Sequence, residues 1–112
     1  GLRAVAGGAD AMAEAAQALA SFGEEFNALR LPSAPARPIR LTDDPYRPQP
    51  RRDRDTEDGM VTTVGRLRPD PALANGIKYV LVSHNTKMGA AKGAILVAEY
   101  LAGAGYLERR PA

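Results

Sequence analysis

The sequence is organised around residues 75–101, which read NGIKYVLVSHNTKMGAAKGAILVAEYL. The β-branched run 77–83 predicts a strand, and the apolar run 89–101 predicts a helix. A polar turn joins the two, so the helix begins where a strand has just ended. Backbone N–H groups at such a helix start are unpaired and carry partial positive charge, which makes this turn a candidate ligand site.

A second strand is predicted upstream, over residues 60–67, where β-branched residues follow the turn signal Asp58-Gly59. A stretch containing proline, asparagine and glycine separates this run from 77–83, which favours an antiparallel pair. Repeated prolines between residues 31 and 50 exclude a helix there and leave 39–41 as the only credible strand.

Residues 9–22 predict an amphipathic helix, because apolar side chains recur at intervals of three and four. These side chains are Met12, Ala15, Ala16, Leu19 and Phe22. Asp10 is a candidate N-cap or first-turn acid, and Gly23 is well placed to end the helix in a left-handed conformation. The predicted fold class is α+β, with an antiparallel or mixed sheet and flanking helices.

The composition is that of an ordinary soluble globular protein, with 45% hydrophobic and 25% charged residues and a net charge of +2 over 112 residues. No apolar run approaches the roughly 18 residues of a membrane span. The N-terminus lacks the pattern of a secretory leader, so a cytoplasmic location is expected. Since the sequence has no Cys, it excludes disulfides and thiolate chemistry within this chain, and no metal site is expected.

The turn 83–93, SHNTKMGAAKG, supports two interpretations. It either contacts a ligand or forms an ordinary capped and tightly packed helix start. It is not a phosphate-binding Walker loop, because Lys92 is followed by Gly93 rather than by Ser or Thr. His84 lacks a nucleophile partner and is expected to be structural, while the side chains of Asn85 and Thr86 suit either capping or a hydrogen bond to a ligand.

The charged run 51–59, RRDRDTEDG, predicts a solvated loop. The alternative is an arginine cluster that faces an anionic ligand or a partner subunit. Paired charges are available within or near this run, at Arg47, Arg51, Arg52, Arg54, Asp53 and Asp55. Aromatic residues that would stack on bases are scarce beside these arginines, so nucleic-acid binding is not expected.

The helix predicted over 89–101 is apolar on nearly every side except at Lys92 and Glu99. One Ala-rich helix and three short strands offer too little surface to cover it. A second chain, or a portion of protein beyond this sequence, is therefore expected to pack against it.

Three stretches together carry a resemblance to a known family. They are LPSAPARPI at 31–39, DPYRPQPRRDRDTEDGMVTTVGRLR at 44–68, and the run 75–101 quoted above. In this order and spacing they resemble the C-terminal part of aspartate-semialdehyde dehydrogenase of the archaeal and fungal type. The resemblance implies an NADPH-dependent reduction of aspartyl phosphate in the pathway from aspartate to lysine, threonine and methionine. A cysteine thiolate and a histidine perform that chemistry in the family, in a region upstream of the one matched here.

The resemblance also assigns roles within this chain. Asn85, Thr86 and Gly89 are expected to contact NADP, with Asn85 near the nicotinamide carboxamide, and no catalytic residue is expected. Residues 1–85 would belong to the catalytic and dimerisation domain. Residues 86–112 would return to pack on a Rossmann-type nucleotide-binding domain that this chain lacks.

The chain is accordingly expected to be a C-terminal fragment or one piece of a split enzyme, inert on its own. Its expected partners are the missing N-terminal portion, in the same or a separate chain, and further copies in a dimer or tetramer. Two alternatives stay open. One is an acyl-thioester reductase such as malonyl-CoA reductase, and the other is a non-catalytic dimerisation module.

Overall fold

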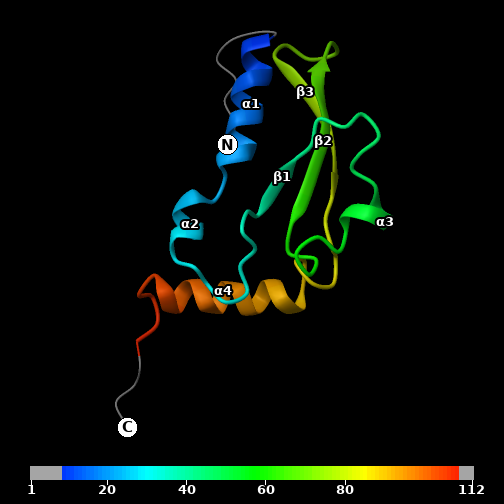
Figure 1. Ribbon diagram of the computed structural model, residues 1–112. Helices are drawn as coiled ribbons and strands as arrows, with labels where there is room; N and C mark the ends of the chain where they lie inside the picture. Colours follow the sequence, from blue (N-terminus) through cyan, green and yellow to red (C-terminus); the bar gives the residue numbers. More distant parts are fainter. Residues whose placement is uncertain (1–8, 109–112) are drawn as a thin grey trace.

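A three-stranded mixed sheet forms the centre of the fold, as the computed structural model of residues 9–108 shows (Figure 1). Its strands are β1 (Ile39–Leu41), β2 (Thr62–Asp70) and β3 (Gly76–Val82), in the order β1-β2-β3. The predicted antiparallel pairing of β2 with β3 is confirmed, and β1 lies parallel to β2. The α+β class is therefore confirmed, with the sheet mixed.

Strand β2 differs from the predicted bounds of 60–67, because it begins at Thr62 and continues through Pro69 to Asp70. The register between β2 and β3 shifts between Gly65 and Arg68, where Arg66 has a φ of 53°. An extra residue at such a bulge bends the strand and increases its twist. Beyond the bulge the ladder resumes, so proline near the strand end does not terminate it.

Helix α1 (Ala9–Ser21) packs on β1 and β2, with Ala11 and Ala15 buried. Small side chains let the helix approach the sheet closely. Gly23 adopts the predicted left-handed conformation, with a φ of 83°. Phe22 was expected on the buried face but is 60% exposed, because the chain turns at residue 23 into the short helix α2 (Glu24–Ala28), which the sequence did not predict. The capping role suggested for Asp10 lies outside the described side chains.

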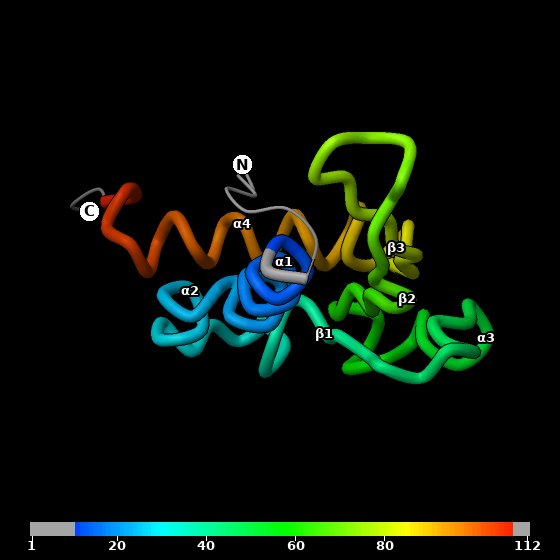
Figure 2. Tube along the Cα trace, turned by 90° about the horizontal axis from the view of Figure 1, so that it is seen from above, coloured from blue at the N-terminus to red at the C-terminus, as the bar shows by residue number. Residues whose placement is uncertain are grey.

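The opposite side of β2 from α1 carries the segment that leads into α3 (Pro50–Asp53) (Figures 1 and 2). This segment lies so close to the strand that a Cβ at Gly65 would be 2.8 Å from Pro48 Cδ. Few apolar side chains are buried among the described residues: Ala11, Ala15, Met60, Val61, Val64 and Leu96, together with Pro35 and Pro38.

Helix α4 (Ala91–Gly103) crosses the end of the sheet and extends beyond it (Figure 1). It begins two residues later than predicted, because residues 85–90 form turns. Leu96 is its only buried residue, while Ile95 and Val97 are 55% and 59% exposed. None of the helices within residues 9–108 is long and apolar enough to cross a membrane.

The molecule is more open than a self-sufficient domain of its size. Its accessible surface is 8071 Å², against about 5,900 Å² for a folded monomer of this mass. Its radius of gyration is 16.6 Å, against about 13 Å for a compact domain of roughly 100 residues. The prediction that α4 lacks sufficient covering surface within this chain agrees with both values.

Candidate functional site

The turn between β3 and α4 is organised by the His84 side chain. Its Nδ1 accepts hydrogen bonds from the backbone N–H groups of Thr86 and Lys87, at 3.3 and 3.2 Å. An imidazole nitrogen that accepts two N–H groups carries no proton itself, so the ring proton of the neutral form is on Nε2. Nε2 lies 3.6 Å from Asp55 Oδ1. His84 thus holds the turn together, in agreement with the expected structural role.

Backbone hydrogen bonds close the turn further. The N–H of Gly89 donates to the carbonyl of His84, and the N–H of Ala91 donates to that of Thr86, both at 3.0 Å. Helix α4 has Ala90 as its N-cap and no side-chain capping hydrogen bond. The capping interpretation of Asn85 and Thr86 is therefore wrong, because the backbone carbonyls of Thr86 and Lys87 accept the N–H groups of Ala91 and Gly93 in place of a side-chain cap.

Asn85 and Thr86 are exposed and border a cavity of about 560 Å³. Its other lining residues come from the end of β3 and the two residues after it, and from α3 and the charged run: Pro50, Arg54, Asp55, Leu81, Val82, Ser83 and His84. Among the described residues, the side-chain amide of Asn85 makes no hydrogen bond, so its donor and acceptor are free for a ligand.

Gly89 lies at a different cavity from Asn85 and Thr86. It borders a groove of about 660 Å³ that is lined largely by apolar residues of α4, by Phe22 and Phe26, and by Pro35 and Pro38. Phe26 and Tyr100 pack against each other beside this groove, with ring centroids 5.7 Å apart. The structure thus brings two of the three expected cofactor residues together, while Gly89 shapes the turn through its N–H.

A cluster of Asp58, Lys87 and Lys92 joins the charged run to this turn, and sequence reasoning did not find it. Lys87 Nζ donates to Asp58 Oδ1, and Lys92 Nζ donates to Asp58 Oδ2 at 2.9 Å. These hydrogen bonds, with the positive charges that make them, lower the pKa of Asp58 to about 2. The only available signal was the Asp58-Gly59 pair, which indicates a turn and no partner.

The pKa of Asp58 gives a direct test of this cluster. We expect a carbon-detected NMR titration to give a midpoint of about 2 for its carboxyl group. Replacing both lysines with methionine should return the midpoint toward the ordinary value of about 3.9. Because folding lowers the pKa of Asp58, its ion pairs stabilise the folded state fully at pH values above the ordinary carboxyl pKa. This stabilisation is lost as the pH falls through the lowered pKa of the folded protein. An unchanged midpoint in the lysine variant would contradict the assignment.

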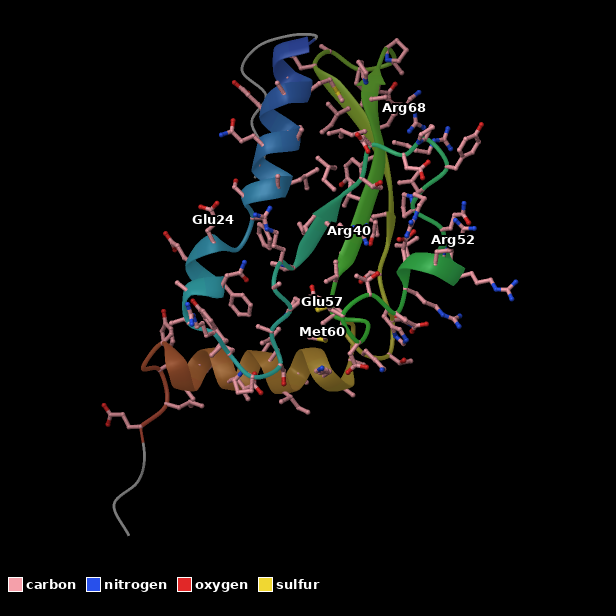
Figure 3. All side chains as sticks on the ribbon, in the orientation of Figure 1. Glu24, Arg40, Arg52, Glu57, Met60 and Arg68 are labelled. Carbon is pink, nitrogen blue, oxygen red and sulfur yellow. The ribbon has the colours of Figure 1, made fainter. Side chains whose placement is uncertain are left out.

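The charged run 51–59 is only partly the solvated loop that was predicted. Asp53 is completely buried and pairs with Arg47 through both carboxylate oxygens, with Arg47 Nε 3.2 Å from Oδ2 and Nη2 bonded to Oδ1. The backbone N–H of Gln49 also donates to Asp53, at 2.7 Å. The Arg47 hydrogen bonds hold the pKa of Asp53 below its usual value. Arg52, by contrast, extends into solvent (Figure 3).

A family model described as semialdehyde dehydrogenase, dimerisation domain, matches residues 5–88. The chain belongs to this family. The match includes the sheet, both halves of the Arg47–Asp53 pair and the start of the turn that carries Asn85. The family resemblance drawn from the sequence is thereby confirmed.

The similar proteins are larger enzymes, and this chain matches only part of each. Aspartate-semialdehyde dehydrogenase of Methanothermobacter thermautotrophicus is 55% identical over 73 residues, which are 65% of this chain and 21% of that protein. Malonyl CoA reductase (NADP) of Metallosphaera sedula is 40% identical over 96 residues, covering 84% of this chain and 26% of that protein. The chain therefore spans about a fifth to a quarter of the length of these curated relatives.

A solved structure supports the fold. Aspartate semialdehyde dehydrogenase with NADP from Candida albicans is 38% identical to this chain, with a TM-score of 0.71. The alignment covers 96% of this chain and 29% of the other. The dimerisation-domain family assignment thus extends to the three-dimensional arrangement of nearly the whole chain.

Proposed function

We propose that this chain is part of an NADP-dependent aspartate-semialdehyde dehydrogenase, which reduces L-4-aspartyl phosphate to L-aspartate 4-semialdehyde with release of phosphate. The observation that carries the proposal is the match of 96% of the chain, at 38% identity, to such an enzyme with NADP. The chain has no Cys, so the thiolate that attacks the acyl phosphate must come from elsewhere in the enzyme. Alone, the chain is inactive.

The nucleotide contact in this proposal is the exposed turn at Asn85. A nicotinamide carboxamide presents one carbonyl acceptor and one NH₂ donor, and the Asn85 amide offers the complementary pair. Thr86 borders the same cavity, and the N–H of Gly89 holds the turn through the His84 carbonyl. When bound, NADPH supplies the hydride. This chain supplies the orientation of the nicotinamide amide.

The partners in this proposal follow from the exposed apolar surface. Residues 86–112 would pack through α4 on a nucleotide-binding domain supplied by the rest of the enzyme, and residues 1–85 would belong to the catalytic and dimerisation domain. The groove beside Phe26 and Tyr100 continues this apolar surface onto α2. A further copy of the enzyme would complete a homo-oligomer, in keeping with the family's dimerisation domain.

The proposal is tested by joining the chain to the remainder of the Methanothermobacter thermautotrophicus relative, in place of the matching segment. We expect Asn85→Ala in this chimera to raise the KM for NADP about tenfold, because one or two hydrogen bonds are lost. Gln17→Ala, which removes an exposed amide on α1, is the matched control. A chimera that reduces no acyl phosphate, or an Asn85→Ala variant that binds NADP normally, would contradict the proposal.

Malonyl-CoA reductase is the second candidate, because the Metallosphaera sedula enzyme is 40% identical to this chain over 84% of its length. The two activities differ in the group that leaves from the acyl carbon, phosphate or a thiol. The substrate-recognition residues of a chimera come from its other parent. The natural protein that contains this chain is therefore the one to assay with aspartyl phosphate and with malonyl-CoA.

A further inference from the structure

The charged run and the Asn85 turn are joined by three polar contacts and one packing contact. Asp58 binds Lys87 and Lys92, and Asp55 lies 3.6 Å from His84 Nε2. Between these contacts, Gly59 packs against the His84 ring so closely that an added Cβ would lie 3.0 Å from its Cγ. The charged run therefore packs against one side of the turn.

Asp58 connects the turn to helix α4. Lys87 lies within the turn and Lys92 within the first turns of α4, so one carboxylate connects the turn to the helix that follows. Asp58 and Gly59 both have left-handed backbones, with φ of 60° and 75°, which aims the carboxylate back across the turn. The cluster is exposed, with Asp58 and Lys87 side chains 58% and 42% accessible. Such a cluster adds little to core packing.

We propose that Asp58 is a positioning residue for nucleotide binding, which holds Lys87 and Lys92 so that the turn presents Asn85 and Thr86 to the cavity beside them. This inference rests on the proposed function, since it concerns the same nucleotide contact. Asp58 touches no nucleotide itself. It acts by limiting the conformations of residues 84–90, which reduces the ordering cost paid when the nucleotide binds.

The test uses Asp58→Asn in the chimera described above. Asparagine tolerates a left-handed backbone as well as aspartate does, so the substitution removes the charge without new backbone strain. We expect the KM for NADP to rise about three- to tenfold, in the range of two exposed ion pairs, with kcat unchanged within about twofold. Asp43→Asn is the matched control, since Asp43 is exposed and has no hydrogen bond or ion pair among the described residues. It should leave both constants unchanged.

Salt and a double variant separate positioning from a general structural role. The ratio of the two KM values, Asp58→Asn over the unchanged chimera, should fall toward one in about 1 M NaCl, where exposed charges are screened. In a background with Lys87→Met and Lys92→Met, Asp58→Asn should have no further effect. If the lysines instead bind the nucleotide phosphates directly, removing Asp58 frees them and lowers the KM, which would overturn the proposal.

The remaining outcomes are also decisive. If Asn85→Ala leaves NADP binding unchanged, the proposed nucleotide contact fails and this inference fails with it. If Asn85→Ala weakens binding but Asp58→Asn behaves like Asp43→Asn, only the positioning role is wrong. A fall in kcat together with a lower thermal midpoint in Asp58→Asn would show general destabilisation and would also overturn the role.

Discussion

Replacing Asp53 with alanine is expected to lower the free energy of unfolding by about 3 kcal/mol. The substitution removes an ion pair that is joined through both carboxylate oxygens, together with the hydrogen bond from the Gln49 N–H. It also leaves Arg47, a half-buried cation, without its partner. Removing one member of such a pair costs more than the pair contributes. Urea unfolding followed by circular dichroism would measure the change.

The pH dependence provides an internal control for this effect. The pKa of Asp53 is lowered by Arg47, so its stabilisation is complete above the ordinary carboxyl pKa of about 3.9 and is lost as the pH falls through the native pKa. The difference between the two proteins should therefore shrink in acid. Asp43→Ala, at an exposed site, should change stability by no more than about 0.5 kcal/mol. An equally small effect of Asp53→Ala at neutral pH would contradict the structural role.

Gly65→Ala is expected to destabilise the fold by about 2 to 3 kcal/mol. A Cβ at this position would lie 2.8 Å from Pro48 Cδ and from Thr42 Cγ2, and closer still to the carbonyl oxygen of Arg47. Two of the obstacles are backbone or proline ring atoms, which cannot rotate away. The segment that carries Arg47 must therefore move off the strand. Thermal or urea unfolding would measure the loss.

The matched control is Gly103→Ala at the end of α4. There the nearest atom to an added Cβ is Leu31 Cδ2, at 3.1 Å, the end of a flexible side chain. Alanine also favours a helix over glycine by about 1 kcal/mol, so this variant should be neutral or stabilising. Because Gly65 and Asp53 both act on Arg47, their double variant should lose less stability than the sum of the single ones. If the two losses of stability are additive, Gly65 and the Asp53 ion pair do not both act through the segment that carries Arg47.

Local patterns in the sequence were sufficient to predict the main elements. The β-branched runs that became β2 and β3, and the glycine at position 23, depend on neighbours close in the chain. Helix α2 was missed because its five residues follow a glycine and carry no complete apolar period. The burial of Asp53 was missed because it depends on Arg47 and on the fold of the proline-rich segment between them.

The sequence predicted where the candidate site lies in the chain, but it did not predict which residues contact one another there. The turn at Asn85 was recognised because it lies between a strand and a helix that are both evident locally. Asp58 is separated from Lys87 by 29 positions in the sequence, and no periodicity relates residues at that distance. The sequence also could not show that Gly89 borders a different cavity from Asn85, because this depends on how α4 crosses the end of the sheet (Figure 1). Contacts between turns require the tertiary fold.

The place of β3 at the end of the order β1-β2-β3 has a consequence for handling this chain in isolation. Within the described residues its outer edge has no neighbouring strand, and Tyr79 and Leu81 beside it are 45% and 51% exposed. An unpaired edge with apolar side chains is a template for another strand. Lys78 is the one charged residue of β3 that opposes such pairing. In concentrated solution, this edge would therefore favour association between separate copies of the chain.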